Sequence, residues 1–313
     1  MAGWGENREK VIRSSAIEWL KIRSDDGAVP LNREQILDFQ FEGEPFRLQP
    51  TQTGIWKPRG FESALSIVTV YRGPGQKRPY EDAIGSDNLI RYAWRGDDPD
   101  HHDNRALRNA MNNQVPVIWF IGVGMGPATF QPVCPVYLIA EEPELQRFVI
   151  APVDDEAFLP RDPGKGTEIQ ETVKRYLMRE TRIRLHQPVF RSTVLRAYET
   201  RCAVCNLGHR VLLDAAHIVP DADELGIASV VNGMALCKIH HAAYDSWILG
   251  ISPDHRIHIR PDLLEEIDGP MLQYGLKELH GSKLMKLPTA RTERPRADLL
   301  EIAYNKFLEA EPA

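Results

Sequence analysis

Hydrophobic side chains recur at helical spacing near the start of the chain. Their separations of three and four residues predict a helix over residues 7–24. Its apolar positions are Val11, Ile12, Ala16, Trp19 and Leu20. A second, shorter helix is predicted over residues 32–38, where Asn32 stands in the position that caps the first turn.

From residue 46 to about residue 150 the pattern changes to short runs rich in β-branched and aromatic residues. The runs SALSIVTVY, QVPVIWFIGV, VCPVYLIA and RFVIA are separated by Gly, Pro and Asp, as strands joined by turns are. A single helix, predicted over residues 103–113, interrupts them. This half is therefore expected to be α+β, with a small, mostly antiparallel sheet or barrel.

Pro, Gly and Asp are frequent in residues 151–167, which we interpret as a linker. A basic helix is expected after it, followed by a compact second domain. Helical spacing predicts that this domain ends with helices over residues 262–274 and 296–309. The predicted organisation is residues 1–150, with a helical extension at 1–45, then residues 151–187 as linker and basic helix, and finally residues 188–313.

Composition is that of an ordinary globular protein, since 42% of the 313 residues are hydrophobic and 26% are charged. The chain has no apolar run of about 18 residues and no basic-then-apolar leader, so we expect no membrane span and no secretion. A cytoplasmic protein is the resulting expectation.

Charge is unevenly distributed along the chain. The net charge of −6 argues against non-specific binding of nucleic acid, which requires Lys and Arg to neutralise phosphates. Residues 171–201, however, contain eight basic and three acidic side chains. This stretch is either a solvated helix face or a strip that follows a phosphate backbone.

Three of the four cysteines occur in two short knuckles. Cys202 and Cys205 form one C-x₂-C pair, and Cys237 with His240 forms a C-x₂-H pair 31 residues later. Two such knuckles predict a closed, tetrahedral structural zinc site in a reducing compartment. Cys134 lies between prolines and is expected to be a buried core thiol.

The second knuckle, CKIHHAAYD, contains one histidine more than the zinc requires. His241 and Asp245 are four residues apart and share a helix face. His240 is rotated by about 100° from His241, so it can bind the zinc while His241 faces elsewhere. Upstream, strand alternation in VLLDAAHIVP places Asp214 on one face and His217 on the other.

Residues 198–260 resemble the HNH endonuclease family through the pattern AAHI…NG…LC-x₂-HH-x₃-D. The resemblance implies a ββα-metal fold in which His217 is the general base and Asn232 orients the loop or the base. It also implies a catalytic divalent metal. The implied ligands are Asp214, His241 and Asp245.

One position departs from the family pattern. Many HNH proteins have a metal ligand immediately before the base histidine, but this chain has Ala216 there. Asp214, two residues back on the same strand face, is the expected substitute. Two carboxylates and one imidazole favour Mg²⁺ or Mn²⁺ over Zn²⁺ as the catalytic ion.

Residues 45–150 resemble the SRA domain, a PUA-like barrel that flips modified cytosine out of DNA. The resemblance rests on GIWKPRG, ALSIVTVY, PYEDAIGSDNLIRYAWRGDD, DNRALRNA and VPVIWFIG, in this order. It implies that Tyr80 and Tyr92 sandwich the flipped base and that Asp82 reads its N4 amino group. An in-register copy would place the carboxylate at position 83, which is Ala83. Trp94 is an expected wall of the pocket.

Each pocket residue also has an ordinary structural interpretation. The two tyrosines are compatible with sheet packing, and Asp82 is compatible with a turn. Lys57 and Arg59 are expected either to contact DNA or to be plain surface charges. Because a methyl group contributes only about 1–3 kcal/mol of discrimination, the sequence leaves the cytosine modification open.

The two resemblances together predict a modification-dependent, type IV-like restriction endonuclease acting on double-stranded DNA that contains modified cytosine. One HNH site cuts one strand, so a homodimer is expected for a double-strand break. Two alternatives stay open: an HNH nuclease whose reader takes other DNA or RNA, and a non-catalytic, zinc-stapled binder of modified DNA.

Overall fold

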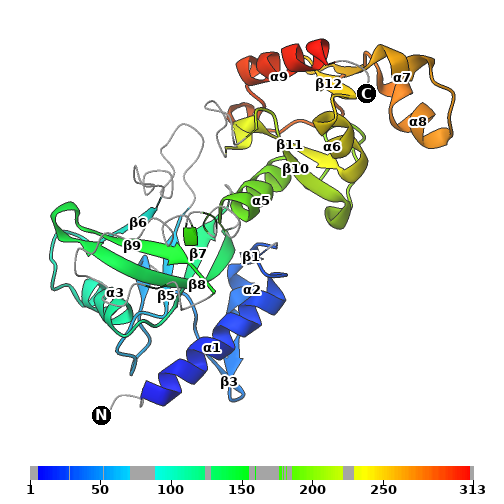
Figure 1. The fold of residues 1–313 in the computed structure, drawn as a ribbon. Helices are drawn as coiled ribbons and strands as arrows, with labels where there is room; N and C mark the ends of the chain where they lie inside the picture. Colours follow the sequence, from blue (N-terminus) through cyan, green and yellow to red (C-terminus); the bar gives the residue numbers. More distant parts are fainter. Residues whose placement is uncertain are drawn as a thin grey trace. The chain divides into compact units, whose positions relative to one another are not determined.

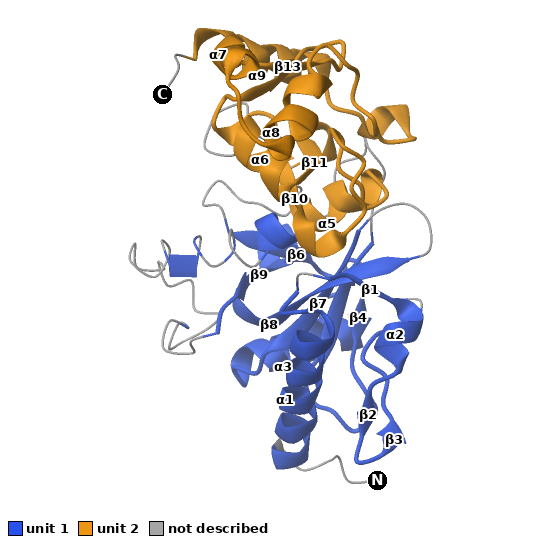
Figure 2. Ribbon diagram, turned by 90° about the vertical axis from the view of Figure 1, so that its right-hand side faces the viewer, with its two compact units in different colours: residues 1–189 blue, residues 190–313 orange. Residues whose placement is uncertain are grey.

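The computed structural model divides the chain into two compact units, Met1–Val189 and Phe190–Ala313 (Figures 1 and 2). No described helix is both long enough and apolar enough to cross a bilayer. The residues that the structure describes are 6–27, 29–51, 53–70, 89–123, 128–154, 159, 176–177, 179, 181, 185–220 and 229–310.

The first unit is built on a seven-stranded sheet with the order β4-β5-β7-β8-β9-β6, and β1 also pairs with β8. Among the described strands of this sheet, only the β5–β7 pair is parallel, so the expected, mostly antiparallel character is confirmed. The strands are β1 Leu31–Asn32, β4 Ile55–Trp56, β5 Ser66–Thr69, β6 Ile90–Ala93, β7 Val117–Gly122, β8 Thr129–Glu142 and β9 Arg147–Pro152, beside a small hairpin of β2 Gln40–Phe41 and β3 Glu44–Pro45.

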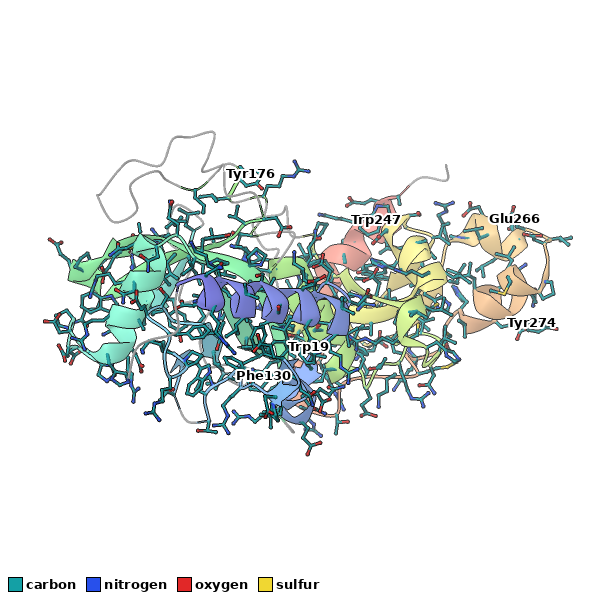
Figure 3. The ribbon with its side chains drawn as sticks, turned by 90° about the horizontal axis from the view of Figure 1, so that it is seen from below. Trp19, Phe130, Tyr176, Trp247, Glu266 and Tyr274 are labelled. Carbon is teal, nitrogen blue, oxygen red and sulfur yellow. The ribbon has the colours of Figure 1, made fainter. Side chains whose placement is uncertain are left out.

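Strand β7 is buried on both faces, which explains its continuous apolar run. Its odd-numbered residues, such as Trp119, pack in one core with helix α3, His102–Asn112. Its even-numbered residues, such as Phe120, pack in a second core with helix α1, Glu6–Arg23. Trp19 of α1 and Phe130 of β8 belong to that second core (Figure 3).

The three N-terminal helices that the sequence predicts are confirmed. Helix α2, Arg33–Leu37, follows α1 and begins at the expected cap, because the Asn32 side chain accepts a hydrogen bond from the Gln35 backbone N–H at 2.8 Å. The Gln35 side chain accepts in return from the Asn32 N–H at 2.9 Å, which completes a capping box. Together with the sheet, these helices confirm the α+β class.

The sheet is curled, and a side chain joins its two end strands. Tyr92 on β6 donates its hydroxyl hydrogen bond to the carbonyl of Gly54, one residue before β4, at 2.9 Å. Among the described strands no ladder joins β6 to β4.

The second unit contains a β-hairpin followed by a helix. Strands β10, Leu213–His217, and β11, Gly233–Cys237, pair antiparallel, and helix α6, Lys238–Asp245, follows directly. Helix α5, Gln187–Ala197, precedes this ββα element and begins in the last residues of the first unit. The elements that follow it are β12 Leu249–Ile251, β13 Ile257–Ile259, α7 Pro261–Glu265, α8 Pro270–Gly275 and α9 Ala297–Glu309.

The predicted helix over residues 262–274 is wrong as a single element. The structure has two short helices, α7 and α8, separated by residues 266–269. Pro270 opens the second helix at its first turn, and it cannot continue a helix that arrives from Gly269, because it lacks an N–H and restricts the preceding residue. The predicted C-terminal helix is confirmed as α9.

A buried arginine joins α1 to the sheet. Arg13 is 2% exposed, and its guanidinium donates to the carbonyls of Ala64 and Pro116 at 2.8 and 2.6 Å. It also pairs with Glu9 at 2.8 Å. Replacing Arg13 therefore leaves a carboxylate and two carbonyls without their donor in a dry environment.

We expect Arg13→Met to lower the free energy of unfolding by about 3–5 kcal/mol, the usual result of removing one partner of a buried ion pair. Arg8→Met is the matched control, because Arg8 pairs with Glu42 in an exposed position and should change the stability by about 0–1 kcal/mol. Urea unfolding of the full chain measures both. Equal effects from the two variants would contradict the assigned role of Arg13.

Candidate active site

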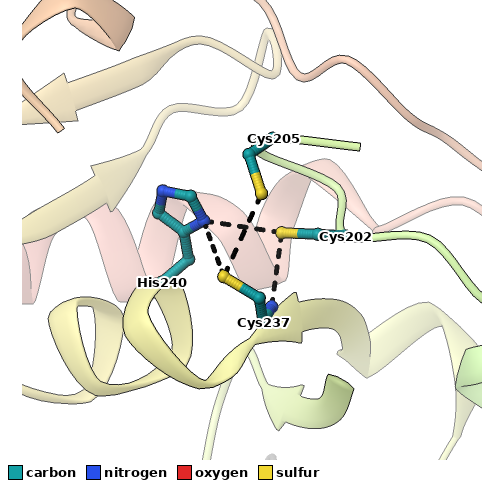
Figure 4. Close-up of side chains that lie close together, drawn as sticks. All are labelled: Cys202, Cys205, Cys237 and His240. Atoms are coloured by element: carbon teal, nitrogen blue, oxygen red, sulfur yellow. Dashed lines mark hydrogen bonds between the residues drawn. The ribbon is translucent and has the colours of Figure 1, made fainter. Parts of the chain in front are cut away.

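Three sulfur atoms and one imidazole nitrogen converge in the second unit (Figure 4). The Sγ atoms of Cys202 and Cys237 lie 3.5 and 3.1 Å from His240 Nδ1, and Cys205 Sγ lies 4.0 Å from Cys237 Sγ. Ligands of a tetrahedral zinc ion are separated by roughly 3.5–3.8 Å, given bonds of about 2.0–2.3 Å. The four residues therefore fit a structural zinc site.

Backbone contacts hold the first knuckle against the hairpin. The Ala203 N–H donates to the Ala235 carbonyl of β11 at 2.7 Å, and the Cys237 N–H donates to Cys202 Sγ at 3.3 Å. The turn closes through Asn206, whose N–H donates to the Cys202 carbonyl at 2.9 Å. These bonds bring the two knuckles together although they are far apart in sequence.

A backbone carbonyl determines which nitrogen of His240 faces the sulfur atoms. His240 Nε2 lies 2.7 Å from the carbonyl of Gly275 at the end of α8, so Nε2 carries the hydrogen and Nδ1 is presented to the cluster. Burial lowers the pKa of His240, but hydrogen bonds with Cys202 and Cys237 raise it more strongly, to about 10. A metal ion bound here takes the place of that proton.

His217 is the last residue of β10, and contacts of both its backbone and its imidazole ring determine its position. In the ladder it lies opposite Gly233. The ring of Phe190 on α5 stacks on the imidazole, with centroids 3.9 Å apart and planes 10° apart.

Asn232 is fully buried and fixes the loop that follows His217. Its side chain accepts from the Val219 N–H and donates to the Val219 carbonyl, both at 2.9 Å. Its own carbonyl accepts from the Ile218 N–H at 2.9 Å. Three hydrogen bonds thus hold the two residues after His217 in one conformation.

The three expected ligands of the catalytic metal are only partly brought together. His241 Nε2 and Asp245 Oδ2 lie 3.3 Å apart on one face of α6. Asp214 instead pairs with Lys238 at 2.8 Å and with Arg191 at 3.3 Å. Among the described residues, no group of three possible ligands within 4.8 Å contains any of these three side chains.

The electrostatics of Asp214 follow from its two cationic neighbours. Partial burial raises the pKa of its carboxyl, but Lys238, the Ala215 N–H and Arg191 together lower it below the ordinary value. Asp214 is therefore an ionised carboxylate that is already neutralised by protein cations. Neither Lys238 nor Arg191 stands out in the sequence, because each becomes a partner of Asp214 only through the fold.

The expected base pocket of the first unit lies partly outside the described residues, since Tyr80 and Asp82 belong to the undescribed segment 71–88. Tyr92 packs against the core beside α3, and burial raises the pKa of its phenol far above the ordinary value. Trp94 packs near Phe148, with the Arg108 guanidinium 5.8 Å from its ring.

The two loop cations expected to contact DNA differ in the structure. Lys57 donates to the carbonyl of Phe61 at 2.8 Å and so closes its own loop. The Arg59 side chain is exposed on the turn between Lys57 and Phe61.

A second group of possible ligands, His101, His102 and Asp103, lies at the start of α3. The Asp103 carboxylate contacts Arg95, and the His101 ring accepts from the Asp103 N–H at 3.2 Å as the helix cap. In the sequence this group is visible as three adjacent possible ligands, HHD. Their contacts serve helix capping and ion pairing.

Residues 202–252 match the family model described as HNH endonuclease. This segment contains both knuckles, the hairpin with His217 and Asn232, and helix α6. It is an HNH endonuclease domain, and the prediction of a metal-dependent nuclease is confirmed.

Among solved structures, the chain is similar to the modification-dependent TagI restriction endonuclease, with a TM-score of 0.28, 16% identity, and coverage of 82% of this chain and 85% of that chain. It is also similar to the type IV phosphorothioation-dependent restriction endonuclease ScoMcrA, with a TM-score of 0.23 and 14% identity. That match covers 83% of this chain and 56% of the other. A comparison with curated protein sequences finds no match.

We expect Cys202→Ser to reduce the bound zinc from about one ion per chain to nearly none and to unfold the second unit, because structural zinc supplies folding free energy directly. Cys134→Ser is the matched control, since Cys134 lies on β8 of the first unit. Elemental analysis and thermal unfolding test both variants. Full zinc content in the Cys202 variant would contradict the assigned ligand set.

Proposed function

We propose that this protein is a modification-dependent DNA endonuclease, which flips a 5-methylcytosine-type base and hydrolyses phosphodiester bonds nearby. The HNH domain supplies the nuclease. The observation that supports its mechanism best is the position of His217, at the end of β10, with the following loop fixed by Asn232.

In this mechanism His217 accepts a proton from the attacking water, a role suited to an imidazole near neutral pH. The water oxygen forms a bond to phosphorus while the bond from phosphorus to the 3′-oxygen breaks. The products are a 5′-phosphate and a 3′-hydroxyl. Asn232 acts on the loop and keeps His217 at its place.

His241 and Asp245 are the proposed residues that would hold a catalytic Mg²⁺ or Mn²⁺ ion, and such an ion would stabilise negative charge on the phosphate oxygens and on the leaving 3′-oxygen. Asp214 is the proposed third ligand. Asp214 could bind the metal only if Lys238 and Arg191 released its carboxylate and paired with other anions. DNA phosphates could serve as those anions. Zinc, held by the Cys₃His cluster, has a structural role in this proposal.

The reader is proposed from the sequence resemblance to the SRA domain, together with the curled sheet of the first unit. Tyr80 and Tyr92 would enclose the flipped base, Asp82 would accept from its amino group, and Trp94 would form a wall. Lys57 and Arg59 would contact the adjacent backbone. Because Tyr92 is held by the core and by Gly54, it would be a fixed wall of this pocket.

A homodimer is proposed because each chain has one HNH domain, and a double-strand break requires two cuts. The dimer would bring two copies of His217 to opposite strands of the same duplex. Sedimentation of the protein with and without DNA tests this assembly, and a strict monomer in both states would overturn it.

Cleavage of matched duplexes carrying cytosine, 5-methylcytosine or 5-hydroxymethylcytosine, with and without Mg²⁺ or Mn²⁺, tests the reader and the nuclease together. We expect metal-dependent cleavage of modified duplexes only. His217→Ala should lower the cleavage rate by roughly 10²–10⁴-fold while zinc content and DNA binding are retained.

His209→Ala is the control, because His209 precedes the hairpin and belongs to none of the proposed sites. Unchanged cleavage by His217→Ala would refute the mechanism. Equal cleavage of all three duplexes, or cleavage of RNA alone, would refute the reader and leave the nuclease in place. Binding of modified DNA without any cleavage would favour a non-catalytic binder.

A further inference from the structure

The stack between Phe190 and His217 joins a helix to the end of the hairpin. Phe190 is 3% exposed and belongs to the core of the second unit. Its ring lies parallel to the imidazole, with the centroids 3.9 Å apart and the planes at 10°. A face-to-face contact of this kind restricts rotation of the imidazole about χ2, a torsion that is otherwise broad.

A glycine allows Phe190 to approach so closely. Gly233 faces His217 across the ladder, and a Cβ atom added to it would lie 2.9 and 3.0 Å from two atoms of the Phe190 ring. The same Cβ would lie 2.5 Å from Val194 Cγ2. Just after the end of α5, the hydroxyl of Tyr198 lies 3.4 Å from the Gly233 carbonyl. Phe190 and Val194 therefore place one face of α5 on this glycine, and Tyr198 contacts it from the turn that follows.

Two separate constraints consequently act on His217. The hydrogen bonds of Asn232 fix the backbone immediately after it, and none of them involves the imidazole ring. The stacking contact with Phe190 acts on the imidazole ring and not on the backbone of His217. General-base catalysis requires both, because the accepting nitrogen must lie within hydrogen-bond reach of the water.

We infer that Phe190 is a positioning residue for the nuclease reaction, which holds the imidazole plane of His217 in the orientation that accepts the proton. This inference rests on the proposed role of His217 as the general base. Phe190 does not touch the reacting atoms, and it acts only through the histidine. Phe190 is also a core residue, so the variants below separate the orientation of the imidazole from the stability of the fold.

Phe190→Leu keeps an apolar side chain but removes the flat ring. We expect kcat to fall by roughly 10–100-fold, as a small misplacement of a catalytic group does, while KM, DNA affinity and zinc content are unchanged. Phe190→Tyr keeps the ring and should restore most of kcat. Val194→Ala is the matched control, because it removes buried volume from the same helix face beside Gly233 and should leave kcat unchanged.

The wild-type protein provides a measurement that does not depend on any variant. The ring current of a stacked phenyl group should move the His217 Cε1–H proton resonance upfield in the NMR spectrum of the full-length, zinc-loaded protein. Phe190→Leu should abolish this shift, and Val194→Ala should preserve it. A wild-type resonance at the ordinary position of an exposed histidine would overturn the inference.

The kinetic outcomes distinguish this inference from the proposed function. If His217→Ala still cleaves DNA, the base assignment fails and the role of Phe190 fails with it. If His217→Ala is inactive while folded Phe190→Leu keeps the wild-type kcat, only the positioning role fails. Equal losses of kcat in Phe190→Leu and Val194→Ala would show that packing alone matters.

Discussion

The convergence of Cys202, Cys205, Cys237 and His240 is the contact on which the second unit depends. These side chains come from the turn after α5, from the end of β11 and from the first turn of α6. Through the Gly275 carbonyl, the same cluster also holds the end of α8. Binding of structural zinc to such sites contributes roughly 10–16 kcal/mol, which is comparable to the whole stability of a typical domain, about 5–15 kcal/mol.

The side chains proposed to react lie on the elements that this cluster joins. Cys237 ends β11, whose first residue lies opposite His217, and it is also the N-cap residue of α6, which carries His241 and Asp245. The hairpin and the helix that bear the proposed reactive groups therefore meet at one proposed metal ligand. Asn232, Gly233 and Phe190 then refine the position of His217 within that framework.

Features governed by neighbours in sequence could be predicted. The N-cap at Asn32 and the helices α1, α3 and α9 follow from spacing and cap chemistry, and the two knuckles follow from ligand spacing. The Gly269–Pro270 pair marks the break between α7 and α8, although the apolar spacing continues across it.

Features governed by contacts between distant segments could not be predicted in this way. Asp214 has Lys238 and Arg191 as partners because α6 and α5 both reach β10, and no local pattern encodes such a meeting. The Phe190 ring stands in a basic stretch without a motif, so its contact with His217 becomes visible only in the fold. The pairing order of the sheet in the first unit is likewise a property of the whole chain.

Because His240 and His241 are adjacent, the number of residues between Cys237 and each histidine matters as much as the chemical identity of the side chains. One residue of an α-helix corresponds to a rotation of about 100°, so a single step along the helix separates the proposed structural role of His240 from the proposed reactive role of His241. Deletion of one residue between Cys237 and His240 would turn the wrong imidazole toward the sulfur atoms, and insertion of one residue would turn neither imidazole toward them. Lys238 and Ile239 are the two positions between these proposed ligands, and a substitution at either one leaves the spacing of Cys237 and His240 intact.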